Sequence, residues 1–223
     1  MINYFCHMNN RKKILGVPVD AYQPHEFIVK IKKGLQDNRL KTIFAVNAEK
    51  ILFARRDFEM YKILNESDFL IPDGFGPVVG LRLSYGLKIA RTTGVELMQR
   101  LLGLAEKEKA KVFIFGAKPE VIKSAEKNII KKYPFIDIVG AHHGYVLPED
   151  YKELIEGINT LKTDILFVGL GSPKQEKWIY KHKRLLKVKI CMGIGGSIDV
   201  LAGKTQLAPT WISNFYMEWI YRL

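Results

Sequence analysis

The chain has 223 residues, of which 48% are hydrophobic, and this is enough to bury the core of one α/β domain. Lysine and arginine number 35 against 23 aspartates and glutamates, a formal net charge of +12. The excess favours an anionic partner but does not choose among nucleic acid, a phosphate-bearing substrate and anionic lipid.

The two cysteines, Cys6 and Cys191, lie far apart with no CxxC pair, so we expect a reducing cytoplasmic setting and no metal site. Polar residues interrupt the first ten positions, where a secretory signal needs an unbroken apolar core. No later stretch reaches the roughly 18 apolar residues of a spanning helix. Any contact with a membrane is therefore expected from its surface.

Short apolar runs alternate with longer amphipathic segments. Several runs are continuously apolar, as is typical of parallel strands covered on both faces. This alternation predicts an α/β fold, Rossmann-like and layered, with a mainly parallel sheet flanked by helices. The expected strands are Ile14–Val19, Thr42–Val46, Val112–Phe115, Ile136–Val139, Ile165–Val168 and Val188–Met192. The expected helices are Pro24–Gln36, Ala48–Arg55, Val95–Lys107, Pro119–Lys132, Glu149–Thr160 and Lys174–Leu186.

The C-terminal segment Pro209–Leu223 differs from the rest because it is dense in aromatic residues. Trp211, Phe215, Trp219 and Arg222 recur at three- and four-residue spacing, which predicts one face of an amphipathic helix. We expect one α/β domain over residues 1–203 and a membrane-facing appendage over residues 204–223. The same aromatic helix could serve a contact between subunits of a homo-oligomer, so the oligomeric state stays open.

Ligands of parallel α/β sheets bind at the carboxyl ends of the strands, so the residues that follow each strand are the candidate site. Asn47 follows the second expected strand, where its amide could bind a substrate hydroxyl or cap the next helix. Asp73 follows the apolar run Phe69–Ile71 within Pro-Asp-Gly. A partly apolar setting there would raise the pKa of the carboxyl group, as a general base requires, although plain turns use the same residues.

Two glycine-rich segments follow later strands. In Gly169–Trp178, backbone N–H groups near Gly171 could hold a diphosphate, Lys174 adds positive charge, and the Gln175 amide could reach a ligand. In Gly193–Asp199, glycines such as Gly195 let a ligand approach the backbone, and Asp199 could accept hydrogen bonds from a ribose or a base. Gly169–Trp178 matches neither the dinucleotide fingerprint nor the P-loop, so a structural glycine-rich turn remains the alternative there.

Four further features bear on a nucleotide site or a metal site. Tyr145 could stack on a base or cover the edge of the core, and Arg91 could neutralise phosphate or form a surface salt bridge. His142 and His143 are adjacent, so their side chains diverge and do not predict a metal site. The chain also lacks Asp-x-Asp, with which many sugar-nucleotide transferases hold a divalent ion, so side chains and backbone amides would neutralise the leaving group.

Taken together, these segments resemble the WecG/TagA/CpsF family of bacterial glycosyltransferases, from about Ile14 to Leu223. The resemblance is carried by long motifs in the right order: Ile71–Gly76, Leu166–Trp178, Gly195–Gly203, Ala208-Pro209 and Glu218–Leu223. It implies an N-acetylmannosaminyltransferase of the TagA type that uses no cofactor or metal and inverts the anomeric centre. The implied donor is UDP-N-acetylmannosamine, and the implied acceptor is N-acetylglucosamine on diphospho-undecaprenol, in teichoic acid or related surface-polysaccharide synthesis.

The resemblance also implies residue roles. Asp73 takes the proton of the acceptor hydroxyl, and Asn47 and Gln175 belong to the active site. Tyr145 and Asp199 match positions linked to uridine, and Arg91 and Arg222 match arginines linked to the diphosphates. The family often has a threonine where this chain has Ala45, which removes one hydroxyl contact. Members usually continue past the Tyr-Arg-Leu motif with more basic residues, whereas this sequence ends at Leu223.

We expect the enzyme to lie peripherally on the cytoplasmic face of the bacterial membrane. There the C-terminal helix would meet anionic lipid and close over the site with Arg222; packing on the protein body is the alternative. Glucose or N-acetylmannosaminuronic acid remain alternative donor sugars. A basic nucleic-acid-binding protein is the rival from another class, but helix-turn-helix and RNP patterns are missing. A nicotinamide-dependent oxidoreductase is disfavoured because Gly16–Asp20 lacks the GxGxxG pattern.

Overall fold

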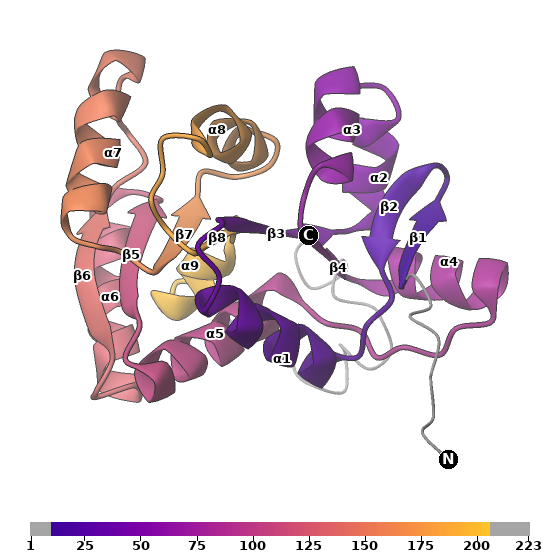
Figure 1. The fold of residues 1–223 in the computed structure, drawn as a ribbon, viewed down its shortest axis with the longest axis horizontal. Helices are drawn as coiled ribbons and strands as arrows, with labels where there is room; N and C mark the ends of the chain where they lie inside the picture. The colour runs from indigo at the N-terminus through magenta and orange to yellow at the C-terminus, as the bar shows by residue number, and fades with distance from the viewer. Residues whose placement is uncertain (1–9, 206–223) are drawn as a thin grey trace.

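The protein is built on six parallel strands in the order β4-β3-β8-β7-β5-β6 (Figure 1). This arrangement is seen in a computed structural model, which describes residues 10–205. The predicted α/β fold with a mainly parallel sheet is confirmed. The strands are β3 (Lys41–Val46), β4 (Phe69–Pro72), β5 (Lys111–Gly116), β6 (Asp137–His142), β7 (Ile165–Gly169) and β8 (Ile190–Gly193).

Helices cover both faces of the sheet because alternate strand residues point to opposite sides. In β7, Ile165 and Phe167 belong to one hydrophobic core, and Leu166 and Val168 belong to the other. The first core is covered by α1 (Pro24–Leu35), α5 (Gly94–Glu108), α6 (Pro119–Lys132) and α9 (Ser197–Leu201). The second is covered by α2 (Ala48–Ala54), α3 (Phe58–Asn65), α7 (Tyr151–Thr160) and α8 (Lys174–His182), which lie on the opposite side in Figure 1.

The prediction of a single strand over Ile14–Val19 is wrong. The segment instead contains parts of two antiparallel strands, β1 (Arg11–Ile14) and β2 (Val17–Asp20), which form a separate hairpin. Leu15 and Gly16 form its two-residue turn with φ angles of 50° and 86°, the positive values that such hairpin turns require. The turn was not predicted because only one of its two residues is glycine and the other, Leu15, continues the apolar run.

The hairpin is joined to β4 by polar contacts. The Asp20 carboxylate accepts hydrogen bonds from the Arg11 guanidinium at 2.7 and 2.9 Å and from the Leu70 backbone N–H at 2.8 Å. The Arg11 guanidinium also donates to the backbone carbonyls of Ser67 and Asp68. Asp20 is buried and Arg11 half-buried, and every contact is charge-assisted, so this network ties the N-terminal hairpin firmly to the sheet.

The predicted helices are present with small shifts of their ends, except that α8 stops at His182 instead of Leu186. Beyond the predicted set, the structure has the helices α3, α4 (Phe75–Tyr85) and α9, and a short 3₁₀ turn η1 (Pro148–Asp150). Within residues 10–205, no helix combines the length and the apolarity needed to cross a bilayer. The predicted C-terminal helix over Pro209–Leu223 lies outside the described residues.

Candidate active site

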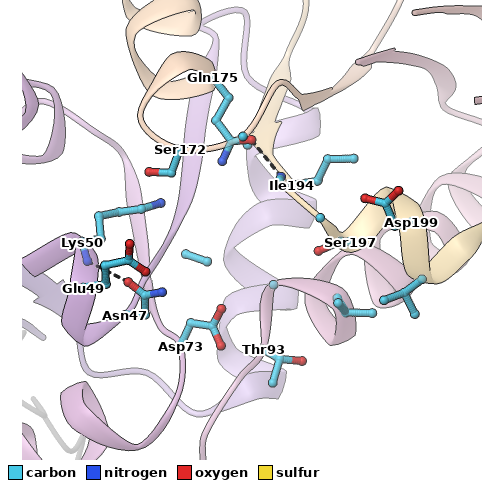
Figure 2. A pocket seen from close by; sticks show the side chains of 18 of the residues that line it. Asn47, Glu49, Lys50, Asp73, Thr93, Ser172, Gln175, Ile194, Ser197 and Asp199 are labelled. Atoms are coloured by element: carbon cyan, nitrogen blue, oxygen red, sulfur yellow. Dashed lines mark hydrogen bonds between the residues drawn. The ribbon is translucent and has the colours of Figure 1, made fainter. Parts of the chain in front are cut away.

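A cavity of about 680 Å³ opens at the carboxyl ends of the strands (Figure 2). Neighbouring strands β3 and β8 are followed by helices on opposite faces, α2 and α9, and such a switch point leaves a crevice between them. Loops after β3, β4, β7 and β8 line the cavity, together with the start of α5. Six predicted site residues lie here: Asn47, Asp73, Gly171, Gln175, Gly195 and Asp199.

One wall carries Asn47 and Asp73. The Asp73 backbone N–H donates to the Val46 carbonyl at 2.9 Å, which continues the β3–β4 pairing by one step. Gly74 has a φ of 84°, a conformation that glycine adopts without strain, and the chain turns there from β4 into α4 directly after Asp73. The half-buried Asp73 carboxylate is thereby directed into the cavity (Figure 2).

Asn47 caps a helix and lines the cavity at the same time. Its Oδ1 accepts a hydrogen bond of 2.8 Å from the Lys50 backbone N–H, the predicted N-cap interaction of α2. The amide nitrogen then points away from the helix and toward the cavity (Figure 2). The two readings of Asn47 are therefore compatible, because each uses a different atom of the amide.

The opposite wall is held by Gln175, which is 3% exposed. Its Oε1 accepts from the Gly195 backbone N–H at 2.8 Å, and its Nε2 donates to Glu176 Oε1 at 3.0 Å. These contacts fix the orientation of the amide and join the first turn of α8 to the loop after β8. Gly193 supplies the space, because a Cβ at that position would lie 3.1 Å from Gln175 Nε2.

The site also contains a buried ion pair that was not predicted from the sequence. The Lys50 ammonium lies 2.5 Å from Glu176 Oε1, and the two side chains are 8% and 0% exposed. Lys50 lines the cavity. The available signal was its position three residues after Asn47, in the first turn of the same helix. Other residues that line the cavity and were not predicted as site residues include Glu49, Phe53, Thr93, Gly94, Ser172 and Ser197.

The remaining predicted residues are not part of the cavity that residues 10–205 form. Arg91 is half-buried on the segment before α5, while Tyr145 and Lys174 are exposed. Arg222 lies outside the described residues. Across the part of the chain that the structure describes, no three His, Cys, Asp or Glu side chains gather as metal ligands would.

Comparison with known proteins identifies the family of this chain. The model of the Glycosyl transferase WecG/TagA/CpsF family matches residues 12–223. A Bacillus subtilis (strain 168) protein named N-acetylglucosaminyldiphosphoundecaprenol N-acetyl-beta-D-mannosaminyltransferase is 36% identical over 198 residues, which cover 88% of this chain and 77% of that protein. A Staphylococcus aureus (strain NCTC 8325 / PS 47) protein of the same name is 34% identical over 214 residues, covering 94% of this chain and 82% of that protein. This chain therefore belongs to the WecG/TagA/CpsF family and is a glycosyltransferase.

Proposed function

We propose that the chain transfers N-acetylmannosamine from UDP-N-acetylmannosamine to N-acetylglucosaminyldiphosphoundecaprenol. The names of the two relatives supply the sugar and the acceptor. The observation that carries the proposal is the pairing of Asp73 with Asn47 on one cavity wall, opposite Gln175 and the glycine-rich loop after β8. A carboxylate faces the space where two substrates would meet, as a general base must.

The reaction is a single displacement at the anomeric carbon. The Asp73 carboxylate takes the proton from the acceptor hydroxyl, and the hydroxyl oxygen forms the new bond to the anomeric carbon. The bond between that carbon and the diphosphate oxygen breaks, and UDP leaves with the electron pair. Because the nucleophile enters opposite the leaving group, the configuration at the anomeric carbon is inverted.

The nucleotide is assigned to the wall formed after β7 and β8. Gly171 and Gly195 have φ angles of 77° and 48°, and neither carries a side chain that would keep a ligand from the backbone. Asp199 lines the same cavity and can accept hydrogen bonds from ribose or base. Tyr145, Arg91 and Arg222 keep their proposed roles toward uridine and the diphosphates from the resemblance alone. Lys174 keeps its proposed role as a positive charge beside the nucleotide from its place in the segment Gly169–Trp178.

Metal independence and membrane attachment belong to the same proposal. Positive side chains and backbone amides neutralise the departing diphosphate, so EDTA leaves the rate unchanged. The acceptor is a membrane lipid, so the enzyme works peripherally at the cytoplasmic face, with residues 204–223 facing the bilayer. UDP-glucose and UDP-N-acetylmannosaminuronic acid are the alternative donors.

The test is transfer from UDP-N-acetylmannosamine to a short-chain lipid diphosphate N-acetylglucosamine in the presence of EDTA, comparing wild type with Asp73→Asn. Wild type forms product, and the variant, which keeps the size of the side chain but accepts no proton, loses about 10²-fold or more in kcat. Asp73→Asn as active as wild type would contradict general-base catalysis by Asp73. If product forms only with another UDP-sugar, that sugar nucleotide is the donor in place of UDP-N-acetylmannosamine.

A further inference from the structure

The Lys50–Glu176 pair joins two parts of the site that are 126 residues apart in sequence. Glu176 Oε1 receives hydrogen bonds from both the Lys50 ammonium and the Gln175 amide, at 2.5 and 3.0 Å. Gln175 in turn accepts from Gly195 at 2.8 Å. One fully buried carboxylate thus connects the first turns of α2 and α8 and, through Gln175, the loop after β8, behind the cavity.

Fold stability does not account for this pair. The desolvation of two buried charges roughly cancels their attraction, and apolar residues of similar volume often serve a fold as well. Glu176 Oε2 is also buried without a hydrogen-bond partner among the described residues, which adds a cost. The pair therefore contributes little to the stability of the fold. Its position at the cavity indicates a role in binding the substrate.

The pair presents its positive end to the cavity. Lys50 lines the cavity, whereas Glu176 lies behind it and is 0% exposed. An ammonium has three N–H donors, and the described contacts of Lys50 Nζ use one of them. The Gln175 amide oxygen already accepts from Gly195, and one of the two N–H groups of this amide is used by Glu176, so a second N–H can donate to a ligand. Figure 2 shows both groups directed inward from the two walls.

The ammonium can only donate, and the amide has an N–H to donate, so together they favour a ligand oxygen that accepts hydrogen bonds. Among the residues 10–205 that line the cavity, the carboxylates are Glu49, Asp73 and Asp199, and Lys50 is the one with a positive charge. A diphosphate brought among these carboxylates needs a cation, and Lys50 is the one that this part of the chain supplies at the cavity.

We propose that Lys50 binds the diphosphate of the nucleotide donor, and that Glu176 is the positioning residue that holds the Lys50 ammonium and the Gln175 amide toward it. The assignment rests on the proposed function, because it requires a nucleoside diphosphate in this cavity. Negative charge grows on the diphosphate as the sugar leaves it, so a fixed ammonium there also favours the transfer step.

The test compares the binding of UDP and UMP by titration calorimetry, since only UDP has the second phosphate. The main variant is Lys50→Met with Glu176→Gln, which removes both charges together and leaves no buried ion uncompensated. The ratio of the UMP to the UDP dissociation constant falls about tenfold or more, equivalent to about 1.4 kcal/mol. The melting temperature stays near that of wild type, so the loss is not one of folding.

A matched control removes another ion pair that starts from the same helix. Lys177 lies beside Glu176 in α8, but its ammonium pairs with Asp57 at 3.0 Å and with the exposed Glu59 at 2.8 Å, away from the cavity. Lys177→Met with Asp57→Asn leaves the ratio unchanged, because the asparagine still caps α3 and no cavity residue is altered.

The single variant Glu176→Gln tests positioning and serves if the double variant does not fold. It keeps Lys50 but weakens its anchor, so the UMP-to-UDP ratio falls by about threefold, less than in the double variant. A merely structural effect would weaken UDP and UMP together. If wild type binds UDP and the ratio is unchanged in these variants, the assignment of Lys50 is overturned and the proposed function is not. Wild type that binds no UDP overturns the proposed function and this assignment with it.

Discussion

The Asp73 backbone N–H donates to the carbonyl oxygen of Val46, the residue directly before Asn47, at 2.9 Å. This bond places the two polar side chains next to each other at the ends of β4 and β3. Main-chain pairing sets their spacing, so substitution of either side chain leaves the other where it is. Asp73 and Asn47 can therefore be tested separately.

The two functions of Asn47 are separable by mutation. Asn47→Asp keeps the oxygen that caps α2 but replaces the cavity-facing N–H donor with an acceptor. We expect the free energy of unfolding to change by less than about 0.5 kcal/mol and kcat/KM to fall at least about tenfold. Asn47→Ala loses the cap as well and destabilises by about 1 kcal/mol. Urea unfolding measures the first effect and transfer kinetics the second. Full activity of Asn47→Asp would show that Asn47 serves only as the N-cap of α2.

The space beside Asp73, the proposed general base, depends on Gly94 at the start of α5. A Cβ there would lie 3.8 Å from Asp73 Oδ2 and 3.7 Å from Ser197 Oγ, ordinary contact distances. Gly94→Ala is therefore expected to fold with a stability change below about 1 kcal/mol. The methyl group occupies the space next to Asp73, and we expect kcat/KM to fall about tenfold or more because reacting groups tolerate little displacement.

The control for Gly94→Ala is Gly157→Ala in α7, where nothing lies within 4 Å of the added Cβ. This variant gains up to about 1 kcal/mol from helix propensity and keeps full activity. Equal activity in both alanine variants would show that the space at Gly94 is not used by substrate.

His182 makes stability depend on pH. It is buried, and its Nδ1 lies 2.8 Å from the Trp178 carbonyl, to which it donates. Burial lowers the pKa of His182 below its ordinary value. The unfolded chain therefore binds the proton first as pH falls, and stability is lost below about pH 7. The carboxylates with lowered pKa values, such as Asp57, affect the pH dependence of stability only at lower pH.

The measurement is the free energy of unfolding in urea at pH 7.5 and pH 5.5 for wild type and His182→Gln. Glutamine can still donate to the Trp178 carbonyl but does not titrate. We expect wild type to lose more stability between the two pH values than the variant, by at most about 1.4 kcal/mol for each unit of pKa shift. Equal losses would contradict a neutral His182 in the folded state.

Cys191 is expected to be inert. It lies in β8 at the centre of the sheet, is 0% exposed, and burial raises the pKa of its thiol. A Cys6→Ser variant should release no thionitrobenzoate from Ellman's reagent at pH 8 while folded, and about one equivalent in guanidinium chloride. Rapid labelling of the folded variant would show that β8 opens.

Much of the fold was predictable because parallel strands covered on both faces are continuously apolar. The predicted elements were wrong or missing where the apolar pattern does not mark where a strand begins or ends. The run around Leu15 continues through a hairpin turn, and β4 is only four residues long. α4 contains two glycines and a proline and has no clear polar face, so its pattern does not indicate a helix.

The site was predictable to the extent that it follows strand ends. Asn47, Asp73, Gln175 and Asp199 occupy such positions, and the resemblance pointed to the same residues. The Lys50–Glu176 pair was not predictable, since its partners are far apart in sequence and each is an ordinary charged residue of an amphipathic helix. Only the packing of α8 near α2 brings the two charges together.

The hairpin anchored by Asp20 makes the two borders of the sheet unequal. β4 is a border strand, and one of its N–H groups, that of Leu70, is taken by the Asp20 carboxylate. Exposed border strands invite pairing with other chains, which leads to aggregation or exchange of strands between copies. At the opposite border, no strand of residues 10–205 pairs with the outer side of β6. The hairpin thus shields the border nearer to Asp73, and intermolecular strand pairing, if the enzyme aggregates, should begin at β6.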